Sequence, residues 1–360
     1  MMIHRRIVIL FTLFFSVCGN HEDSSQVEES SLFAPRSYDH LDGRSTLKIG
    51  FGSCLDQDKP LAIFETVKSA KPDMFLMIGD NVYGDTNDGE LREMAGAYRK
   101  QKSNFREQDI DFPVEAIWDD HDYGLNDAGG DYTHKQASEQ HFFDFWEVPE
   151  DDVRRTRPGL YREQRLALKG KTVQIVYLDT RYFRGNLTPT DEKGAEGKER
   201  YLPTVDTTQT MLGETQWAWL EERLSSQADF RLIVSSVQFL ASGHGWECWS
   251  MIPHERARMI NLLDKLGVEN VLFLSGDRHR GGLYRLTTDG DNTIHEITSS
   301  PLNATTFPSS EPGPHRINGP TYTDHNFGLI TINAEEGKIT AELLGKDGNS
   351  VNSLTVQMDG

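Results

Sequence analysis

Four short stretches of this sequence carry side chains that can bind metal ions, and each follows a run of apolar residues. The stretches are residues 52–54, 79–85, 118–126 and 276–279, and they contain thiol, carboxylate, phenol, amide and imidazole groups. Carboxylates that are crowded together repel one another, so they must either share protons or be compensated by cations. Since side chains of these types are common metal ligands in proteins, we expect bound cations.

Two of these stretches place an aspartate directly after a glycine. Asp80 follows Gly79, and Asp277 follows Gly276. A glycine lets the backbone turn sharply, and we expect it to leave the next carboxylate exposed. Asp80 and Asp277 are therefore the best candidate ligands. Either could bridge two ions, as in hydrolases whose two metals hold the attacking and leaving oxygens.

The other candidate ligands differ in the metals that they favour. Cys54 and Tyr83 would add anionic ligands suited to a trivalent transition metal. Asp119 and Asn126 offer hard oxygen atoms suited to calcium or magnesium. Each stretch alone has a simpler explanation, because a Gly-Asp pair after a strand is often only a turn and a cysteine there is often a small buried hydrophobe. The coincidence of four such stretches favours the metal site.

Four apolar runs must position these groups. They cover residues 47–51, 73–78, 113–118 and 270–274, and their composition predicts buried strands. In an α/β sheet, the loops that follow the strand ends meet in one crevice. We therefore expect the four stretches to converge.

The rest of the chain predicts further helices and strands. Helices are expected over residues 61–69, 90–101, 134–146, 213–224 and 253–266. Strands are expected as a hairpin over 161–168 and 171–178, and then over 232–236, 283–286, 293–298, 328–332, 338–344 and 353–358. Residues 181–208 lack periodicity and predict a surface insertion. Because no break in composition divides the chain, we predict one α/β (α+β) domain over residues 46–360, a sandwich of two sheets flanked by helices.

The N-terminus has the pattern of an export signal. Arg5 and Arg6 precede an apolar run that ends near residue 18, which is too short for the roughly 20 residues that span a bilayer. We predict a signal peptide over residues 1–18, cleaved either by an ordinary signal peptidase or so that Cys18 carries a lipid anchor. Residues 19–45 are predicted to be a polar tether. The protein is expected to be periplasmic, an outer-membrane lipoprotein or extracellular.

The charge balance excludes one class of function. The 360 residues include 37 Lys and Arg against 56 Asp and Glu, a formal charge of −19. A nucleic-acid scaffold needs cations to neutralise phosphates, so we exclude that role. An anionic small molecule, such as a phosphate ester, would have to be attracted by bound metal instead.

Taken together, the motifs resemble those of the PhoD-like alkaline phosphatases, a branch of the calcineurin-like metallophosphoesterase superfamily. The resemblance rests on Gly52-Ser53-Cys54, Gly79-Asp80-Asn81-Val82-Tyr83, Trp118-Asp119-Asp120-His121, residues 211–217, Ser235-Ser236-Val237-Gln238 and residues 275–279. It runs from about Leu47 to the end of the chain. It implies a four-layer αββα fold and hydrolysis of phosphate monoesters or diesters at a site that holds ferric iron and calcium, with other divalent metals as alternatives.

The resemblance also implies roles for individual residues. The iron ligands would be Cys54, Asp80, Tyr83 and Asp277. The calcium ligands would be Asp119, Asn126 and a bridging Asp80 or Asp277, with Asp120 as a substitute for Asp119. If Cys54 is a thiolate ligand, a disulfide between Cys54 and Cys248 is excluded.

Two histidines and two further residues complete the candidate site. His121 and His279 are expected either as a ligand or as acid and phosphate-orienting groups, with Asp120 beside them. Arg278 and Trp246 are candidate substrate contacts, although a solvated arginine and a core tryptophan are equally good interpretations. Two other functions fit the same residues. One is a phospholipase-D-like enzyme for lipid head groups, and the other is a cell-surface protein that only holds calcium.

Overall fold

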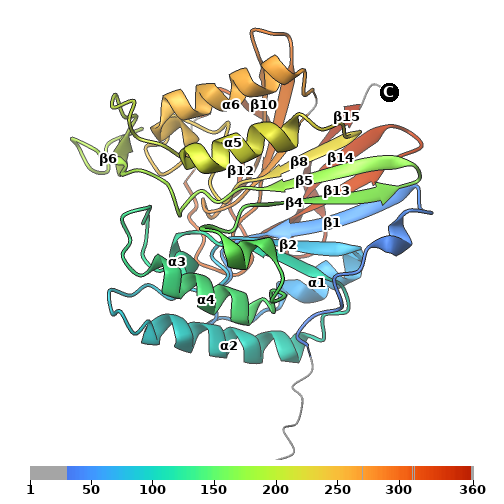
Figure 1. Cartoon of the computed structure of the whole chain (residues 1–360), viewed down its shortest axis with the longest axis horizontal. Helices are drawn as coiled ribbons and strands as arrows, with labels where there is room; N and C mark the ends of the chain where they lie inside the picture. The colour runs from blue at the N-terminus through green and yellow to red at the C-terminus, as the bar shows by residue number, and fades with distance from the viewer. Residues whose placement is uncertain (1–30, 270, 310, 312, 358–360) are drawn as a thin grey trace, which may run out of the picture. The chain divides into compact units, whose positions relative to one another are not determined.

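Two β-sheets lie face to face between layers of helices (Figure 1). The computed structural model describes residues 31–269, 271–309, 311 and 313–357. The predicted signal peptide and Cys18 lie outside the described residues. From Leu32 onwards the chain belongs to one unit.

The first sheet combines parallel and antiparallel strands. Its order is β15 (Ser350–Gln357), β14 (Lys338–Gly345), β13 (Asn326–Asn333), β1 (Thr46–Gly52), β2 (Met74–Ile78) and β3 (Val114–Ile117). β1, β2 and β3 are parallel, so their carboxyl ends lie at one edge. Every residue of β2 is buried, because both faces of the sheet are covered, and this explains its uninterrupted apolar sequence.

The second sheet has its own group of parallel strands. Its order is β12 (Arg316–Tyr322), β10 (Gly281–Thr287), β11 (Thr293–Thr298), β9 (Leu272–Ser275), β8 (Phe230–Val234), β5 (Lys171–Tyr177) and β4 (Arg162–Leu168). β5, β8 and β9 are parallel, so the residues that follow them also gather at one edge.

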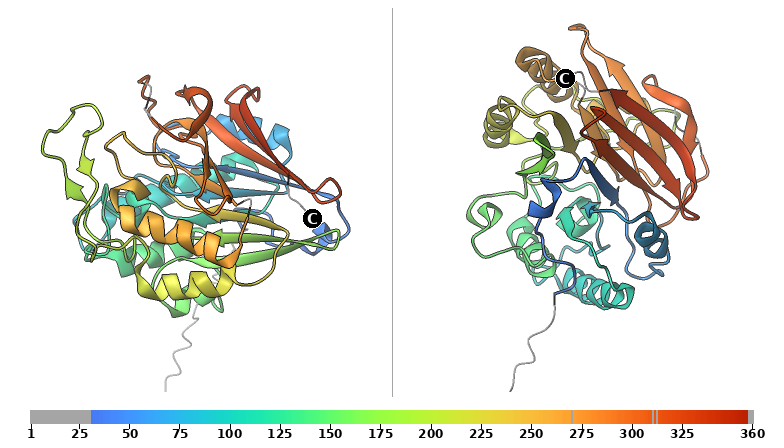
Figure 2. Two further views of the ribbon diagram at one scale, coloured as in Figure 1. Left: turned by 90° about the horizontal axis from the view of Figure 1, so that it is seen from above. Right: turned by 90° about the vertical axis from the view of Figure 1, so that its right-hand side faces the viewer.

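Apolar side chains fill the space between the layers. Leu76, Leu232 and Leu274 belong to the cluster shared by the two sheets. A second cluster joins the first sheet to α1 (Ile63–Ala70), α2 (Arg92–Gln108) and α4 (Lys135–Phe145). A third joins the second sheet to α5 (Gly213–Leu224) and α6 (Pro253–Leu266). Figures 1 and 2 show α5 and α6 on the opposite side of the strands from α2 and α4, which gives the predicted four layers.

The predicted fold class is confirmed, and the differences lie at irregular or polar segments. The predicted helix over 90–101 continues to Gln108 as α2. β12 was not predicted, because Gly319 and Pro320 interrupt its pattern and most of its residues are not buried. Elements that the apolar pattern also misses are the short helix α3 (Asp120–Tyr123) and the 3-10 turns η1 (Asp39–Leu41), η2 (Val153–Thr156) and η3 (Trp249–Met251).

The described half of the predicted tether is folded. Leu32 and Phe33 are buried in the cluster that joins the first sheet to its helices, and the Phe33 ring stacks on Trp146 at 5.4 Å. Arg36 donates from Nε to the carbonyl oxygen of Val114, at 2.9 Å. The prediction that the domain begins at residue 46 is therefore wrong, and the domain begins near Leu32.

The predicted surface insertion is also only partly exposed. It contains the small sheet of β6 (Thr188–Pro189) and β7 (Tyr201–Leu202), which projects from the sandwich in Figure 2. At its start, however, the side chains of Arg181 and Arg184 are buried. They are surrounded by carboxylates, as described below. Within the described residues, no helix is both long enough and apolar enough to cross a membrane.

Candidate metal centre

The four candidate metal-binding stretches come together at one edge of the sandwich. Cys54, Asp80 and Asp119 follow β1, β2 and β3 of the first sheet, and Asp277 follows β9 of the second. Ligand atoms of Asp80, Asp119, Asp120 and Asp277 all lie within 4.8 Å of one another. Two overlapping groups with the same spacing also contain Asp80. One adds Cys54 and His279, and the other combines Asp80 with Asp120 and His121. Both sheets therefore contribute to a single centre.

Left-handed backbone conformations occur at four of these positions. Cys54 has φ 59°, Asp80 has 49°, Asp277 has 65° and His279 has 50°. Residues with a Cβ atom rarely adopt these values, and they cluster at functional sites where the surroundings hold them. The restraint is visible between two of the loops, because the amides of Cys54 and Leu55 donate to the carbonyl oxygens of Gly79 and Asp80.

The two glycines allow the loops to approach closely. A Cβ atom on Gly79 would lie 2.5 Å from Cβ of Asp119, and one on Gly276 would lie 2.2 Å from Oγ of Ser53. The expectation that glycine leaves the next carboxylate exposed is wrong for Asp80, which is 1% exposed. Gly79 instead lets the loops after β2 and β3 approach each other, and Gly276 brings the loop after β9 against Ser53 of the other sheet's loop.

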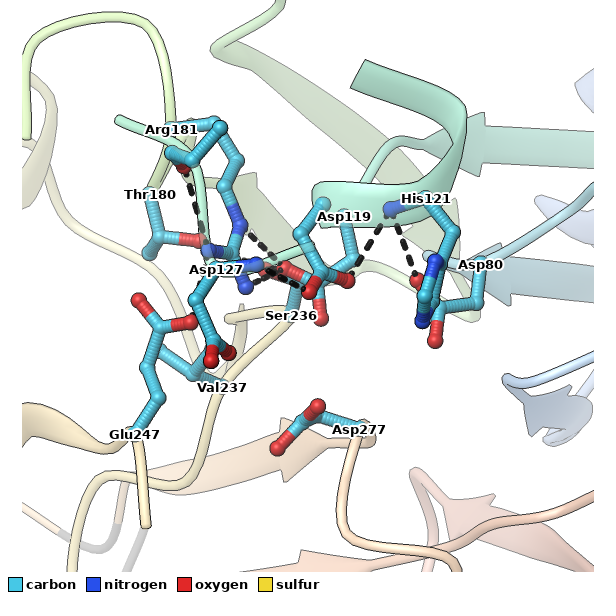
Figure 3. A network of polar contacts seen from close by, with 12 residues as sticks. Asp80, Asp119, His121, Asp127, Thr180, Arg181, Ser236, Val237, Glu247 and Asp277 are labelled. Atoms are coloured by element: carbon cyan, nitrogen blue, oxygen red, sulfur yellow. Dashed lines mark hydrogen bonds and ion pairs between the residues drawn. The ribbon is translucent and has the colours of Figure 1, made fainter. Parts of the chain in front are cut away.

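Burial and mutual repulsion act on two of the carboxylates. Burial, and then the charge of Asp120, hold the pKa of Asp80 well above its usual value. Burial, and then the charge of Asp119, do the same for Asp277. Figure 3 shows Asp277 on a loop separate from that of Asp119, and none of the contacts drawn there reaches its carboxylate. Cations at this centre would remove the repulsion and satisfy the carboxylates, so the residues fit a metal.

Asp119 is held by a buried arginine. Its Oδ1 atom accepts from Arg181 Nε at 2.6 Å and from Ser236 Oγ at 2.6 Å (Figure 3). Its Oδ2 atom is buried and has no hydrogen-bond partner. Burial raises the pKa of Asp119 to about 6, against the opposing effect of Arg181. Hydrogen bonds thus fix one oxygen of Asp119, and the other oxygen is left to coordinate a cation.

Asp120 has a different environment. Its Oδ2 accepts from the backbone of Asp127 at 2.6 Å, and its Oδ1 accepts from the backbone of His121 at 3.0 Å. Burial alone would raise the pKa of Asp120, but nearby His121 and Arg181 hold it below its usual range. Asp120 is therefore a carboxylate that stays ionised beside Asp80.

The Cys54 thiol faces the same centre. Its Sγ atom lies 3.4 Å from Oδ2 of Asp80 and 3.5 Å from the carbonyl oxygen of Asp277. Burial raises the pKa of Cys54 to about 12, so this side chain becomes a thiolate only with a compensating cation. Cys54 and Cys248 are both free, and no disulfide joins them.

Tyr83 and His279 form a pair beside Cys54. The Tyr83 hydroxyl lies 3.1 Å from Nε2 of His279, while Nδ1 of the same ring faces the carbonyl oxygen of Thr305. A carbonyl accepts only, so the proton is on Nδ1 and the lone pair of Nε2 faces the centre. Burial lowers the pKa of His279 to about 4, which keeps the ring neutral, the form that binds metals.

His121 lies between Asp85 and Tyr83. Its Nδ1 lies 2.5 Å from Oδ2 of Asp85, and its ring packs on Tyr83 at 4.4 Å between centroids. Burial alone would lower the pKa of His121, but Asp120 and Asp85 raise it to about 9. At neutral pH the His121 ring is therefore in its cationic form, with a proton on both nitrogens.

A cleft of about 340 Å³ opens beside the carboxylates and includes the other candidates. Asn126 lines it from an exposed position, and its backbone amide donates to Asp85. Arg278 also lines the cleft, with its guanidinium 4.9 Å from the centre of the Trp246 ring and an ion pair to Glu311. Arg278 is buried and Trp246 is partly exposed in the cleft wall, so a solvated arginine and a core tryptophan are both excluded.

Sequence reasoning missed the ion network behind the cleft. Arg181 donates from Nη1 to Glu247 at 2.7 Å, and Arg184 pairs with the same carboxylate at 2.9 Å. Arg181 follows β5 at the same sheet edge as the ligands, so the rule that located Asp80 could have located it. The surrounding polar sequence instead predicted exposure.

Comparison with known proteins gives consistent matches. The model of the family described as PhoD-like phosphatase matches residues 50–343. Alkaline phosphatase D of Bacillus subtilis (strain 168) is 26% identical over 153 residues, which are 40% of this chain and 26% of that protein. The chain thus matches little more than a quarter of that relative's length.

Two solved structures share the fold. The structure of PhoD matches with a TM-score of 0.66 at 16% identity, over 89% of this chain and 71% of that one. GAP50, described as the anchor in the inner membrane complex of Plasmodium, matches with a TM-score of 0.54 at 12% identity, over 88% of this chain and 90% of that one. At these identities the matches show the fold alone.

Proposed function

Since the chain belongs to the PhoD-like phosphatase family, we propose that it is a metal-dependent hydrolase of phosphate monoesters, diesters or both. The observation that carries the proposal is the group of four aspartates whose oxygens lie within 4.8 Å of one another beside a cleft. Burying four carboxylates this close together destabilises the folded protein unless cations compensate their charge. Two-metal centres built from such carboxylates activate water for phosphoryl transfer.

The donor set suggests how two ions would be held. Cys54, Tyr83 and His279 would provide thiolate, phenolate and imidazole donors to a ferric ion. Asp119, Asp120 and Asn126 would provide oxygen donors that suit calcium. Asp80 is grouped with donors of both sets and could serve both ions, whereas Asp277 is grouped with Asp119 and Asp120. When bound, the ions would neutralise the phosphoryl oxygens and lower the pKa of a bound water.

The side chains of this protein would perform the remaining tasks. His121 holds a proton on its ring and lines the cleft, so it would donate to the leaving alcohol oxygen. Asp85 orients that ring through Nδ1, which leaves Nε2 for the substrate. The Arg181–Asp119 ion pair would keep one ligand oxygen in place while the other binds metal.

Metal analysis and hydrolysis assays test this function. Purified protein should contain transition metal and calcium, and it should hydrolyse nitrophenyl phosphate, bis-nitrophenyl phosphate or both. Asp80→Asn should lose bound metal and at least 100-fold in kcat/KM, roughly the loss seen when a key electrostatic group is removed. Asp58→Asn, at an exposed carboxylate outside the centre, should change neither.

Other outcomes would point to the alternative functions. Absence of hydrolysis with iron and calcium supplied would overturn the proposal, and calcium binding alone would then favour a binding protein. Faster release of choline from phospholipid than turnover of simple diesters would favour a phospholipase-D-like enzyme.

We also propose that the protein is exported, because residues 1–18 have the pattern of a signal peptide. Mass spectrometry of the N-terminus after expression in cells distinguishes ordinary cleavage from a lipid-modified Cys18. Retention of the complete N-terminus would contradict export by this route.

A further inference from the structure

One apolar side chain in the cleft has no role in holding metal. Phe307 is 49% exposed and lines the same cleft as Asp80, Asp277 and His279. Single exposed apolar residues are ordinary on protein surfaces. The position of Phe307 is informative because its exposed ring lies within reach of a molecule bound at the carboxylates.

The Phe307 ring is held in place by its own loop. It stacks on the His279 ring, with 5.4 Å between centroids and 28° between planes. The same imidazole is bonded through Nδ1 to the carbonyl oxygen of Thr305, two residues earlier. Two residues later, the carbonyl oxygen of Ser309 accepts from Arg280. The loop thus fixes the ring beside the centre, so little order would be lost when a ligand packs on it.

The cleft is larger than a phosphoryl group alone requires. Its lining includes Trp246, with the guanidinium of Arg200 4.8 Å from the ring centre. A cleft of about 340 Å³ falls at the lower end of the range for small organic ligands. An exposed aromatic ring such as that of Phe307, beside a polar centre, suits a substrate with one charged end and one flat apolar end.

We propose that this cleft selects phosphate esters whose alcohol carries a planar ring, such as aryl or nucleoside esters, and that the ring packs against Phe307. The inference rests on the proposed function and adds its substrate class. In this arrangement the phosphoryl group lies at the carboxylate end of the cleft, and Phe307 is a specificity-determining residue.

Binding of non-hydrolysable analogues tests the inference without turnover. Calorimetry on the metal-loaded full chain would compare phenylphosphonate with propylphosphonate. Phenylphosphonate should bind more tightly by about fivefold, the ratio expected for one aromatic contact. Phe307→Ala should abolish the difference, Phe307→Tyr should keep it, and Val205→Ala, at an exposed residue outside the cleft, should have no effect.

The outcomes separate this inference from the function on which it rests. Equal affinity of the two phosphonates, or an undiminished ratio in Phe307→Ala, would overturn the inference even if the enzyme is active. Equal weakening of both phosphonates by Phe307→Ala would also overturn it, because Phe307 would then act only through His279. Absence of hydrolysis with a retained Phe307-dependent ratio would instead overturn the proposed function.

Discussion

Arg181 brings a positive charge into the interior beside several carboxylates. Its side chain is fully buried, and it pairs with Asp119 on one side and Glu247 on the other. Burying ions is costly, but removing one partner of a buried pair costs more, because the remaining charges lose their compensation. The stability of this region should therefore depend on Arg181 before any metal binds.

Arg181→Met should destabilise the protein by about 3–5 kcal/mol, the usual cost of breaking a buried ion pair. Arg181→Lys should lose less, because it keeps the charge but not the forked geometry. Urea unfolding of metal-free protein measures both. Arg165→Met, which breaks a partly exposed pair with Glu163, should cost within about 1 kcal/mol. Equal stability of the Arg181→Met and Arg165→Met variants would contradict the argument.

Residue types and order predicted much of the candidate site, but not the contacts between its parts. Asp80 and Asp277 could be found because each follows a glycine at the end of an apolar run. Arg181 could not be distinguished from a solvated arginine, because its burial depends on Glu247, which is 66 positions away. The fixed oxygen of Asp119 likewise depends on Ser236 of the other sheet.

At the scale of elements, close packing between β2 and β3 depends on the turn that follows β2. Gly79 has φ 114°, and a Cβ atom on it would lie 2.5 Å from Cβ of Asp119, in the loop after β3. Any side chain here would push the two ligand loops apart. The turn at Gly79 is therefore needed to bring the candidate ligands together, and not only to end β2.

A pair of glycine substitutions can separate crowding from backbone strain. Gly79→Ala places Cβ 2.5 Å from Asp119, whereas Gly170→Ala, in the turn between β4 and β5, has no atom within 4 Å and a φ of 76°. Gly170→Ala should cost about 1–2 kcal/mol from the left-handed conformation alone. Gly79→Ala should cost more and should also reduce metal stoichiometry. Thermal unfolding and metal analysis check this, and equal effects of the two changes would rule out crowding as the cause.

The elements that the sequence predicted well are those buried on both faces. β2 is wholly buried and wholly apolar, so its run is unambiguous. β8 is also wholly buried, but Arg231 interrupts its apolar run, and the predicted strand over 232–236 begins two residues too late. β12 is an edge strand with exposed residues, and residues 32–45 contribute isolated apolar anchors without a period. Such segments fold because of their contacts with other parts of the protein, and the spacing of apolar residues along the sequence does not show those contacts.

At the scale of the whole molecule, the domain includes residues that precede its first strand. Phe33 contacts both Phe105 of α2 and Trp146 after α4. Tyr38 donates to Glu115 of β3 at 2.9 Å. This segment therefore covers helices and strands of the first sheet.

A protein that begins at residue 31 should unfold cooperatively, whereas one that begins at residue 46 should be markedly less stable. Phe33→Ala in the full chain should cost about 3–5 kcal/mol, as for other buried aromatic side chains. Val351→Ala, at a residue that is 40% exposed, should cost little. Circular dichroism during thermal unfolding measures all four proteins. Equal stability of the two truncated forms would show that residues 32–45 add nothing to the fold.

The division of the centre between two sheets also sets the order in which it can be assembled during synthesis. Cys54, Asp80 and Asp120 leave the ribosome first, but Asp277 follows β9 and is synthesised much later. A nascent chain that ends at β8 still lacks Asp277 and His279, so its centre is incomplete. Metal selection should therefore take place wherever β9 docks, so the composition of that compartment, and not the site of translation, would determine which ions are captured.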